Sequence, residues 1–325
     1  MTGILTRLLS LAIVSSFCLL QVVAQTASQG NQIRKTVYDP LKSGNEVRLD
    51  VEYKRIGNKS LKMDVFYPDS KPLKAYPLVV FTHGGGWAGG SKQLLRQRFF
   101  AQLLKELLEK EFCVVSVDYR LFKKNAGNYI RDCVVDSKDA IRFLAKNSDE
   151  FSIDKNRIYT IGSSAGGHIA QLLLLSTDDA FVGDENLAKE KYTVLAGVSW
   201  FGPSDFEKSS LFEVPGSSKP SIEVNDRISD PSLNAEKRLE MVREISPVNY
   251  LSENSHPLLM IQGDKDKTIP VQHAYYMKER AEKVNAPVET LIVKNAGHSW
   301  KKAGGELNPG IDEIIRVTVD FICKH

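Results

Sequence analysis

Short apolar strands alternate with helical segments along most of the chain, and this alternation restricts the fold more than any other sequence feature. Continuous apolar or β-branched runs predict strands at 47–53, 61–67, 78–82, 112–118, 157–161, 194–200, 258–262 and 288–293. Helical spacing of apolar residues predicts helices at 92–110, 132–146, 168–176, 271–284 and 311–324. This order predicts an α/β fold with a mostly parallel eight-stranded sheet and helices on both faces. A Gly57-Asn58 turn predicts an antiparallel N-terminal hairpin.

Residues 202–255 interrupt this regular spacing. They contain Pro203, Pro215, Pro220, Pro231 and Pro247, and one amphipathic stretch at 234–245. The 325 residues would suffice for two average domains, but the sequence shows no internal repeat and no linker-like tract. We therefore predict one catalytic domain at 46–325, with 202–255 as a small lid-like insertion over the sheet.

The N-terminus has the pattern of a secretory signal peptide. Arg7 is followed by an apolar segment, Leu8 to Leu20, and by small residues up to Ala24. We predict cleavage after Ala24, a polar lead at 25–45, and a secreted or periplasmic protein. A retained membrane anchor is the alternative, although the apolar segment is short for a span of about 20 residues. A lipoprotein anchor at Cys18 is disfavoured because bulky Phe17 precedes it.

Composition excludes several classes of protein. The chain is 42% hydrophobic and 26% charged, which is typical of a globular protein. Its 43 Lys and Arg nearly balance its 40 Asp and Glu, so we expect no nucleic-acid partner. Loss of the signal peptide leaves Cys113, Cys133 and Cys323, which allow at most one intrachain disulfide. No zinc-protease motif, paired-cysteine motif or dinucleotide fingerprint occurs, so we expect no metal, no cofactor and no membrane span in the mature chain.

A nucleophile elbow is predicted at Gly162-Ser163-Ser164-Ala165-Gly166, which fits G-x-S-x-G. The pentapeptide joins a predicted strand to a predicted helix, and such a sharp turn exposes its central hydroxyl above the sheet. Ser164 is therefore the candidate nucleophile, and Ser163 is a spacer beside it. The alternative is a chance match in a turn rich in serine and glycine.

A glycine turn, His83-Gly84-Gly85-Gly86-Trp87, follows the strand at 78–82. Successive glycines can present backbone amides to a ligand without obstruction by Cβ atoms. We predict that the amides of Gly85 and Gly86, with that of Ala165, form an oxyanion hole.

A serine nucleophile needs a base and an orienting acid. His298 follows the last predicted strand, where a loop can reach the elbow, and is the candidate base. Asp264 and Asp266 both follow the strand at 258–262. We favour Asp266, because Asp264 sits within the turn and can cap it by accepting loop amides. We interpret Asp118 as structural and leave Asp205 open.

Three residues near these motifs are candidates for the substrate pocket: Trp87, Ser163 and Phe201. Trp87 could stack on a sugar or aromatic acyl group, or could equally be a packing residue. Trp200 and Phe201 fit a pocket floor or core better than a sugar platform. We expect the insertion 202–255 and the residues near Trp87 to set the shape of the pocket.

Together these residues resemble the α/β-hydrolase fold, in its esterase/lipase branch with a HGGG turn. The similarity extends from Val51 to the C-terminus and is greatest to secreted bacterial carboxylesterases of the acetyl-xylan and feruloyl esterase type. The stretches that carry it are 83–87, 117–121, 136–144, 153–158, 162–168, 200–205, 263–270 and 297–298. The segment 122–127 departs from the proline- and acid-containing stretch of hormone-sensitive-lipase relatives, and the N-terminus lacks room for their helical cap.

The resemblance implies a serine carboxylesterase that hydrolyses short-chain, aryl or carbohydrate-linked esters through a Ser-His-Asp acyl-enzyme mechanism. Its partner would be a small-molecule or carbohydrate ester. A serine peptidase of the prolyl-oligopeptidase type is one alternative, but the chain has no room for a propeller domain. An arylformamidase-like amidase is another, against which the export signal counts. An inactive binding module is the third, although all triad members are present.

Overall fold

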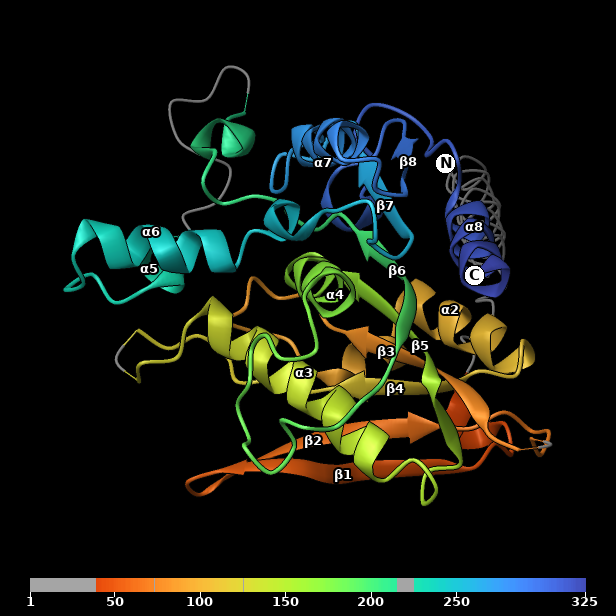
Figure 1. Ribbon diagram of the computed structural model, residues 1–325. Helices are drawn as coiled ribbons and strands as arrows, with labels where there is room; N and C mark the ends of the chain where they lie inside the picture. Colours follow the sequence, from red (N-terminus) through yellow and green to blue (C-terminus); the bar gives the residue numbers. More distant parts are fainter. Residues whose placement is uncertain (1–38, 73, 125, 215–224) are drawn as a thin grey trace, which may run out of the picture. The chain divides into compact units, whose positions relative to one another are not determined.

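The computed structural model describes residues 39–325 except 73, 125 and 215–224 (Figure 1). The predicted signal peptide, its cleavage site and most of the polar lead lie outside the described residues. Across the part that is described, no helix combines the length and apolarity that a membrane span requires.

One eight-stranded sheet forms the centre of the domain, as predicted. Its strands are β1 (Val47–Ile56), β2 (Lys59–Phe66), β3 (Tyr76–Thr82), β4 (Cys113–Val117), β5 (Ile153–Ser163), β6 (Val194–Trp200), β7 (Leu258–Gly263) and β8 (Val288–Val293). They lie in the order β1-β2-β4-β3-β5-β6-β7-β8. The pairs β1–β2 and β2–β4 are antiparallel and the others are parallel. The carboxyl ends of the parallel strands therefore meet at one edge, where α/β sheets place their sites.

Helices cover both faces of the sheet because its strands are apolar on both sides. They are α2 (Arg98–Glu109), α3 (Ile130–Lys146), α4 (Ala165–Leu175), α7 (Gln272–Lys283) and α8 (Ile311–Lys324). Leu78 and Val80 of β3 pack in the core with α3, α4 and α7, whereas Val79 and Phe81 pack in the core with α2 and α8. Figure 1 shows α2 beside α8, with α3 and α4 on the other side of the sheet.

The helix predicted at 92–110 is broken in two. A 3₁₀ turn, η2 (Lys92–Arg96), is separated from α2 by Gln97 in an extended conformation, and Arg98, the first residue of α2, has φ 51°. Lys92 anchors the turn to the sheet, because its Nζ lies 2.5 Å from Asp64 Oδ1 and its amide donates to Asp118 at 2.7 Å. With its start held at the sheet, the chain changes direction before α2 begins. The contact also confirms a structural role for Asp118.

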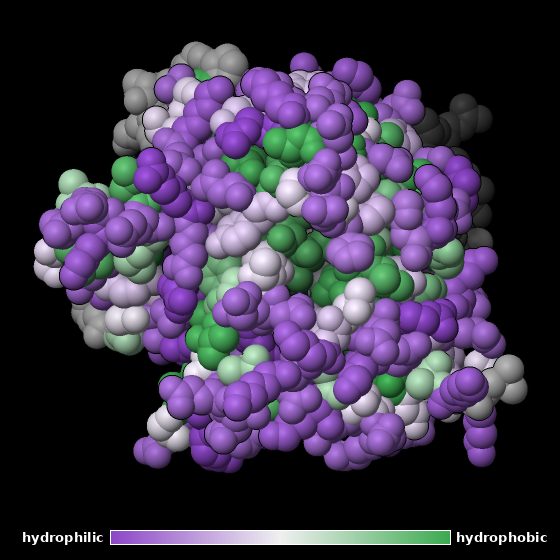
Figure 2. Space-filling model, viewed as in Figure 1, coloured by the Kyte–Doolittle hydropathy of each residue, from purple (hydrophilic) through white to green (hydrophobic). Residues whose placement is uncertain are grey.

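The insertion 202–255 carries four short described elements: η3 (Ser209–Phe212), α5 (Asn225–Ile228), α6 (Ala235–Glu244) and η4 (Pro247–Tyr250). Figure 1 shows α5 and α6 next to each other, at the left of the view. The predicted amphipathic stretch forms α6, but no residue of α6 is fully buried. On the face drawn in Figure 2, hydrophobic side chains gather around a central hollow with hydrophilic side chains around it.

Candidate active site

The predicted elbow is a sharp turn between β5 and α4. Ser164 lies at its apex with φ 55° and ψ −121°, a conformation that L residues rarely adopt. A Cβ at Gly162 would overlap the Gly166 carbonyl, and a Cβ at Gly166 would overlap the Thr82 carbonyl. Both glycines are thus required by close backbone approach. The Ser164 amide donates to Trp200 O on β6 at 2.8 Å, which fixes the turn to the sheet.

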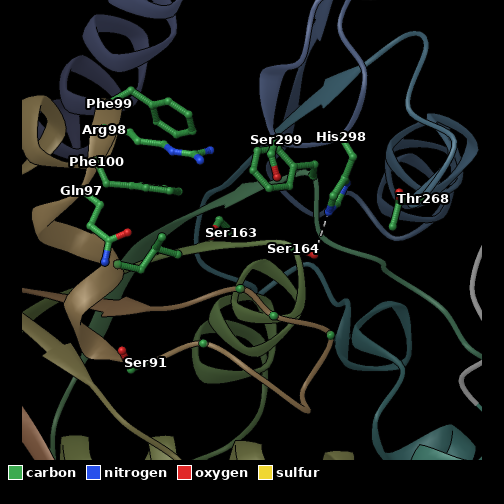
Figure 3. A pocket seen from close by; sticks show the side chains of 16 residues that line it. Ser91, Gln97, Arg98, Phe99, Phe100, Ser163, Ser164, Thr268, His298 and Ser299 are labelled. Carbon is green, nitrogen blue, oxygen red and sulfur yellow. Dashed lines mark hydrogen bonds between the residues drawn. The ribbon is translucent and has the colours of Figure 1, made fainter.

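Three predicted residues meet at this turn. His298 Nε2 lies 3.0 Å from Ser164 Oγ (Figure 3). On the other side of the ring, His298 Nδ1 lies 2.7 Å from Asp266 Oδ2. Ser164 comes from the elbow, Asp266 from the loop after β7, and His298 from the loop after β8. The carboxyl ends of three separate strands therefore assemble one hydrogen-bonded relay, which has the geometry of an activated nucleophile.

The Asp266 carboxylate is buried and held by hydrogen bonds on both oxygens. Its Oδ1 accepts from the amides of Thr268 at 2.8 Å and Ile269 at 3.0 Å. Its Oδ2 accepts from Gln262 Nε2 at 3.2 Å in addition to its contact with His298. These donors leave the carboxylate one orientation, in which Oδ2 faces the imidazole.

The turn-capping role expected of Asp264 belongs to Asp266, so that part of the prediction is wrong. Asp264 Oδ1 is buried and has no hydrogen-bond partner among the described residues, and its Oδ2 lies 3.9 Å from Lys294 Nζ. The reason is that the loop folds back so that its amides converge on Asp266. Asp205, left open above, instead accepts the amides of Glu207 and Lys208 in a turn of its own.

The glycine turn lies directly against the elbow. A Cβ placed on Gly84 would be 3.3 Å from Ser164 Cβ. The Gly85 carbonyl accepts from Ala88 N at 3.2 Å and Gly89 N at 3.0 Å. Because a trans peptide directs its C=O and N–H oppositely, these bonds fix the direction of the Gly86 N–H.

His83 orients the peptide between Gly84 and Gly85 in the same way. Its Nδ1 lies 2.7 Å from Gly84 O, and because a carbonyl only accepts, Nδ1 carries the hydrogen. Burial lowers the pKa of His83 to about 4, so the ring is neutral near pH 7. The Gly85 N–H therefore has a fixed direction. Ala165, the third predicted donor, is the first residue of α4, where a backbone amide has no acceptor within the helix.

Arg227 of α5 completes the support of this turn, and no motif in the sequence predicts this role. Its Nη1 donates to the Gly86 carbonyl at 2.7 Å. A Cβ on Gly86, which has φ 60°, would lie 2.7 Å from that nitrogen. The insertion 202–255 thus contacts the backbone of the predicted oxyanion hole.

A pocket of about 540 Å³ opens beside Ser164 and His298. Ser163 and Phe201, which were predicted for the pocket, line it, and so do Gly85 and Gly86 of the predicted oxyanion hole. The remaining lining residues are Gly84, Gly90, Ser91, Leu94, Gln97, Arg98, Phe99, Phe100, Thr268 and Ser299. The segment from Ser91 to Phe100 thus forms a wall of the pocket (Figure 3).

Comparison with known proteins identifies the family of this chain. The family model described as BD-FAE matches residues 63–281, which is most of the chain. The chain belongs to the BD-FAE family. Among curated proteins it is 29% identical over 244 residues to Esterase LipC of Mycobacterium tuberculosis, covering 75% of this chain and 58% of that protein. It is 28% identical over 267 residues to the isoprenylcysteine alpha-carbonyl methylesterase ICME of Arabidopsis thaliana, covering 80% and 59%. The chain thus spans less than two thirds of both relatives.

Solved structures share the fold of this BD-FAE family member. The apo form of Thermogutta terrifontis esterase 2 has a TM-score of 0.66 at 22% identity, covering 87% of this chain and 95% of that one. A truncated carbohydrate esterase from gut microbiota has a TM-score of 0.67 at 20% identity, covering 89% and 97%. These likenesses confirm the α/β-hydrolase fold.

Trp87 does not line the pocket of this BD-FAE protein, so the prediction of a stacking role is wrong. Its backbone has φ 59°, and its ring is 1% exposed, packed edge-on against His168 and Phe206. Trp87 Nε1 donates to His168 Nδ1 at 3.3 Å, while His168 Nε2 donates to Ile245 O at 2.7 Å. The alternative interpretation, a packing residue, describes it.

The expectation that the insertion 202–255 shapes the pocket is also wrong for its described part. None of its described residues lines the pocket, whose neighbouring wall comes from η2 and the start of α2. The break at Gln97 and Arg98 turns this segment towards Ser164. Residues 92–110 have the apolar spacing of one continuous helix, so this break has no local sequence signal.

The other chemistry-bearing side chains lie outside the pocket. Cys113 and Cys133 are buried thiols and Cys323 is an exposed thiol. Within the described ranges, no group of three or more His, Cys, Asp and Glu could hold a metal ion.

Proposed function

We propose that this chain is a serine carboxylesterase that uses Ser164 as nucleophile, His298 as general base and Asp266 as the orienting acid. The observation that carries the proposal is the relay of Ser164, His298 and Asp266 at a strained elbow, open to a pocket. The names of the curated relatives, an esterase and a methylesterase, support ester hydrolysis as the reaction.

The contacts of the relay support the following cycle. His298 Nε2 takes the proton of Ser164 Oγ as the oxygen attacks the ester carbonyl. Asp266 holds the hydrogen on Nδ1 and stabilises the cationic imidazole. The amides of Gly85, Gly86 and Ala165 stabilise the oxyanion, each by about 3 kcal/mol. His298 then protonates the departing alcohol, and water cleaves the acyl-enzyme by the reverse sequence.

The pocket supports a modest acyl or alcohol group. Its volume of about 540 Å³ and its side chains Leu94, Phe99, Phe100 and Phe201 suit short-chain or aryl esters. Acetyl and feruloyl esters linked to carbohydrate fit this description, and the sequence resemblance favours them. We also propose that residues 1–24 direct export, because such substrates lie outside the cell.

The test combines turnover with covalent labelling. The protein should hydrolyse 4-nitrophenyl acetate and butyrate, and a diethyl phosphoryl reagent should label Ser164 stoichiometrically, as read by mass spectrometry of its peptide. Ser164→Ala should lower kcat by about 10⁴-fold or more and abolish labelling. Ser163→Ala is the matched control and should keep both. Labelling that persists in Ser164→Ala would overturn the nucleophile assignment.

A peptide anilide, acetylated xylan oligomers and methyl ferulate extend the comparison. Hydrolysis of the anilide in preference to the esters would favour a peptidase. Hydrolysis of both acetylated xylan and methyl ferulate at rates well below that of an aryl acetate would contradict the proposal of acetyl or feruloyl esters as substrates.

A further inference from the structure

One cationic side chain lines the pocket of the proposed esterase. Among the described lining residues, Arg98 alone carries a permanent charge, and none is acidic. Figure 3 shows its side chain extending from the start of α2 in the direction of Ser299, with Phe99 and Phe100 as its neighbours in the pocket lining.

The charge of Arg98 has no partner within the described part of the protein. Neither an ion pair nor a hydrogen bond of its guanidinium is found there. By contrast, neighbouring Arg96 lies 3.9 Å from Asp64, and Arg120 binds Asp136 at 2.7 Å. Arg96 and Arg120 are thus paired with carboxylates, whereas the exposed guanidinium of Arg98 lines the pocket without a partner among the described residues.

The position of Arg98 is also unfavourable for folding. It is the first residue of α2, where the helix dipole disfavours a cation by about 0.3–1 kcal/mol, and the first turn contains no acidic residue. Its φ of 51° adds backbone strain. Arg98 at this position therefore does not stabilise the folded state. An anionic ligand, by contrast, would be attracted by both the guanidinium and the N-terminus of the helix.

We infer that Arg98 selects esters that carry a carboxylate a few bonds from the scissile ester group. The inference rests on the proposed esterase function and narrows its substrate class. A guanidinium presents paired N–H donors that match a carboxylate, and nearby aromatic faces bind the intervening carbon chain or ring. Arg98 orients the substrate and makes or breaks no covalent bond. The carboxylate can lie on the acyl side or the alcohol side, and the test separates these.

Two matched substrate pairs provide the test. On the acyl side, monomethyl adipate is compared with dimethyl adipate by pH-stat. On the alcohol side, 4-acetoxybenzoate is compared with methyl 4-acetoxybenzoate by absorbance. The measured quantity is the ratio of kcat/KM for the anionic ester to that for the neutral ester, which cancels changes in folding or in active-enzyme concentration.

The ratio should exceed one for at least one pair and should fall about three- to tenfold in Arg98→Ala. Arg98→Lys should retain part of the preference, and 0.5 M salt should weaken it. Arg157→Ala is the control, because Arg157 is an exposed cation on β5, six residues before Ser163, and does not line the pocket. It should leave the ratio unchanged.

Separate results overturn the two proposals. If the wild-type protein hydrolyses the neutral esters but its ratio does not change in Arg98→Ala, the anion inference is wrong and the esterase proposal stands. If the wild-type protein hydrolyses none of the four esters, the esterase proposal fails and the inference fails with it.

Discussion

Substitution of Asp266 by asparagine is the sharpest test of the relay, because the surrounding donors dictate how the new side chain must lie. The amides of Thr268 and Ile269 require an oxygen at the Oδ1 position. The asparagine amide nitrogen must then occupy the Oδ2 position, where it donates to His298 Nδ1. The hydrogen of His298 is thereby forced onto Nε2, which can no longer accept a proton from Ser164.

A forced tautomer of this kind costs about 10⁴-fold in kcat, which corresponds to about 5.5 kcal/mol. The two backbone hydrogen bonds to the side-chain oxygen survive, and the Gln262 contact is lost, so the free energy of unfolding should fall by only about 1 kcal/mol. Steady-state hydrolysis of 4-nitrophenyl acetate and urea unfolding measure the two quantities. A large loss of activity with a small loss of stability is the expected signature.

Asp264→Asn is the matched control on the same loop. In the part of the chain that the structure describes, its Oδ1 has no hydrogen-bond partner and Lys294 lies 3.9 Å from its Oδ2, so activity should change by less than about threefold. A loss in Asp264→Asn equal to or greater than that in Asp266→Asn would refute the assignment. A loss below tenfold in Asp266→Asn would refute the tautomer argument.

Three further predictions follow from the site and its supports. Gly166→Ala should lower stability by about 3 kcal/mol or prevent folding, because the new Cβ would overlap the Thr82 carbonyl; thermal melting measures this. Arg227→Ala should reduce kcat about three- to thirtyfold with little change in melting temperature or KM, since it removes one charged donor to Gly86 O; an equal loss in stability would indicate a structural role instead. Burial lowers the pKa of His83 and His168 to about 4 and that of His273 to about 3. Because the native state keeps them neutral, the unfolded state binds more protons below pH 6.5, and each ring should remove up to about 1.4 kcal/mol of stability per pH unit between pH 6.5 and about 4. Urea unfolding at pH 7, 6 and 5 would contradict this if the three values agree.

The features predicted from sequence are those whose cause is local. The elbow is predictable because the backbone approaches closely at positions 162 and 166, so both must be glycine, and the sequence therefore shows a glycine two residues on each side of Ser164. The sheet is predictable because β3 is buried on both faces, which requires a continuous apolar run. His298 is predictable because it lies in the loop after β8, whose carboxyl end is at the same edge as the elbow.

The features that were missed depend on contacts between distant segments. The break before α2 depends on Lys92 reaching Asp64 of β2, 28 residues earlier. The burial of Trp87 depends on His168, which in turn donates to Ile245 in the insertion. The choice between Asp264 and Asp266 depends on where the loop amides converge. No periodicity or motif in the sequence indicates these contacts. The residues that form the pocket wall could therefore be identified only from the structure.

The insertion 202–255 therefore affects the proposed chemistry differently from a lid. Its described residues do not line the pocket, yet Arg227 binds the Gly86 carbonyl. The other side of the same turn is held by His83, whose ring stacks on Tyr119 at 4.2 Å and which donates to Gly84 O. One support thus comes from the sheet and the other from the insertion. Changes in the insertion should accordingly appear first in kcat, through the backbone conformation of Gly86, and only secondarily in which ester is bound.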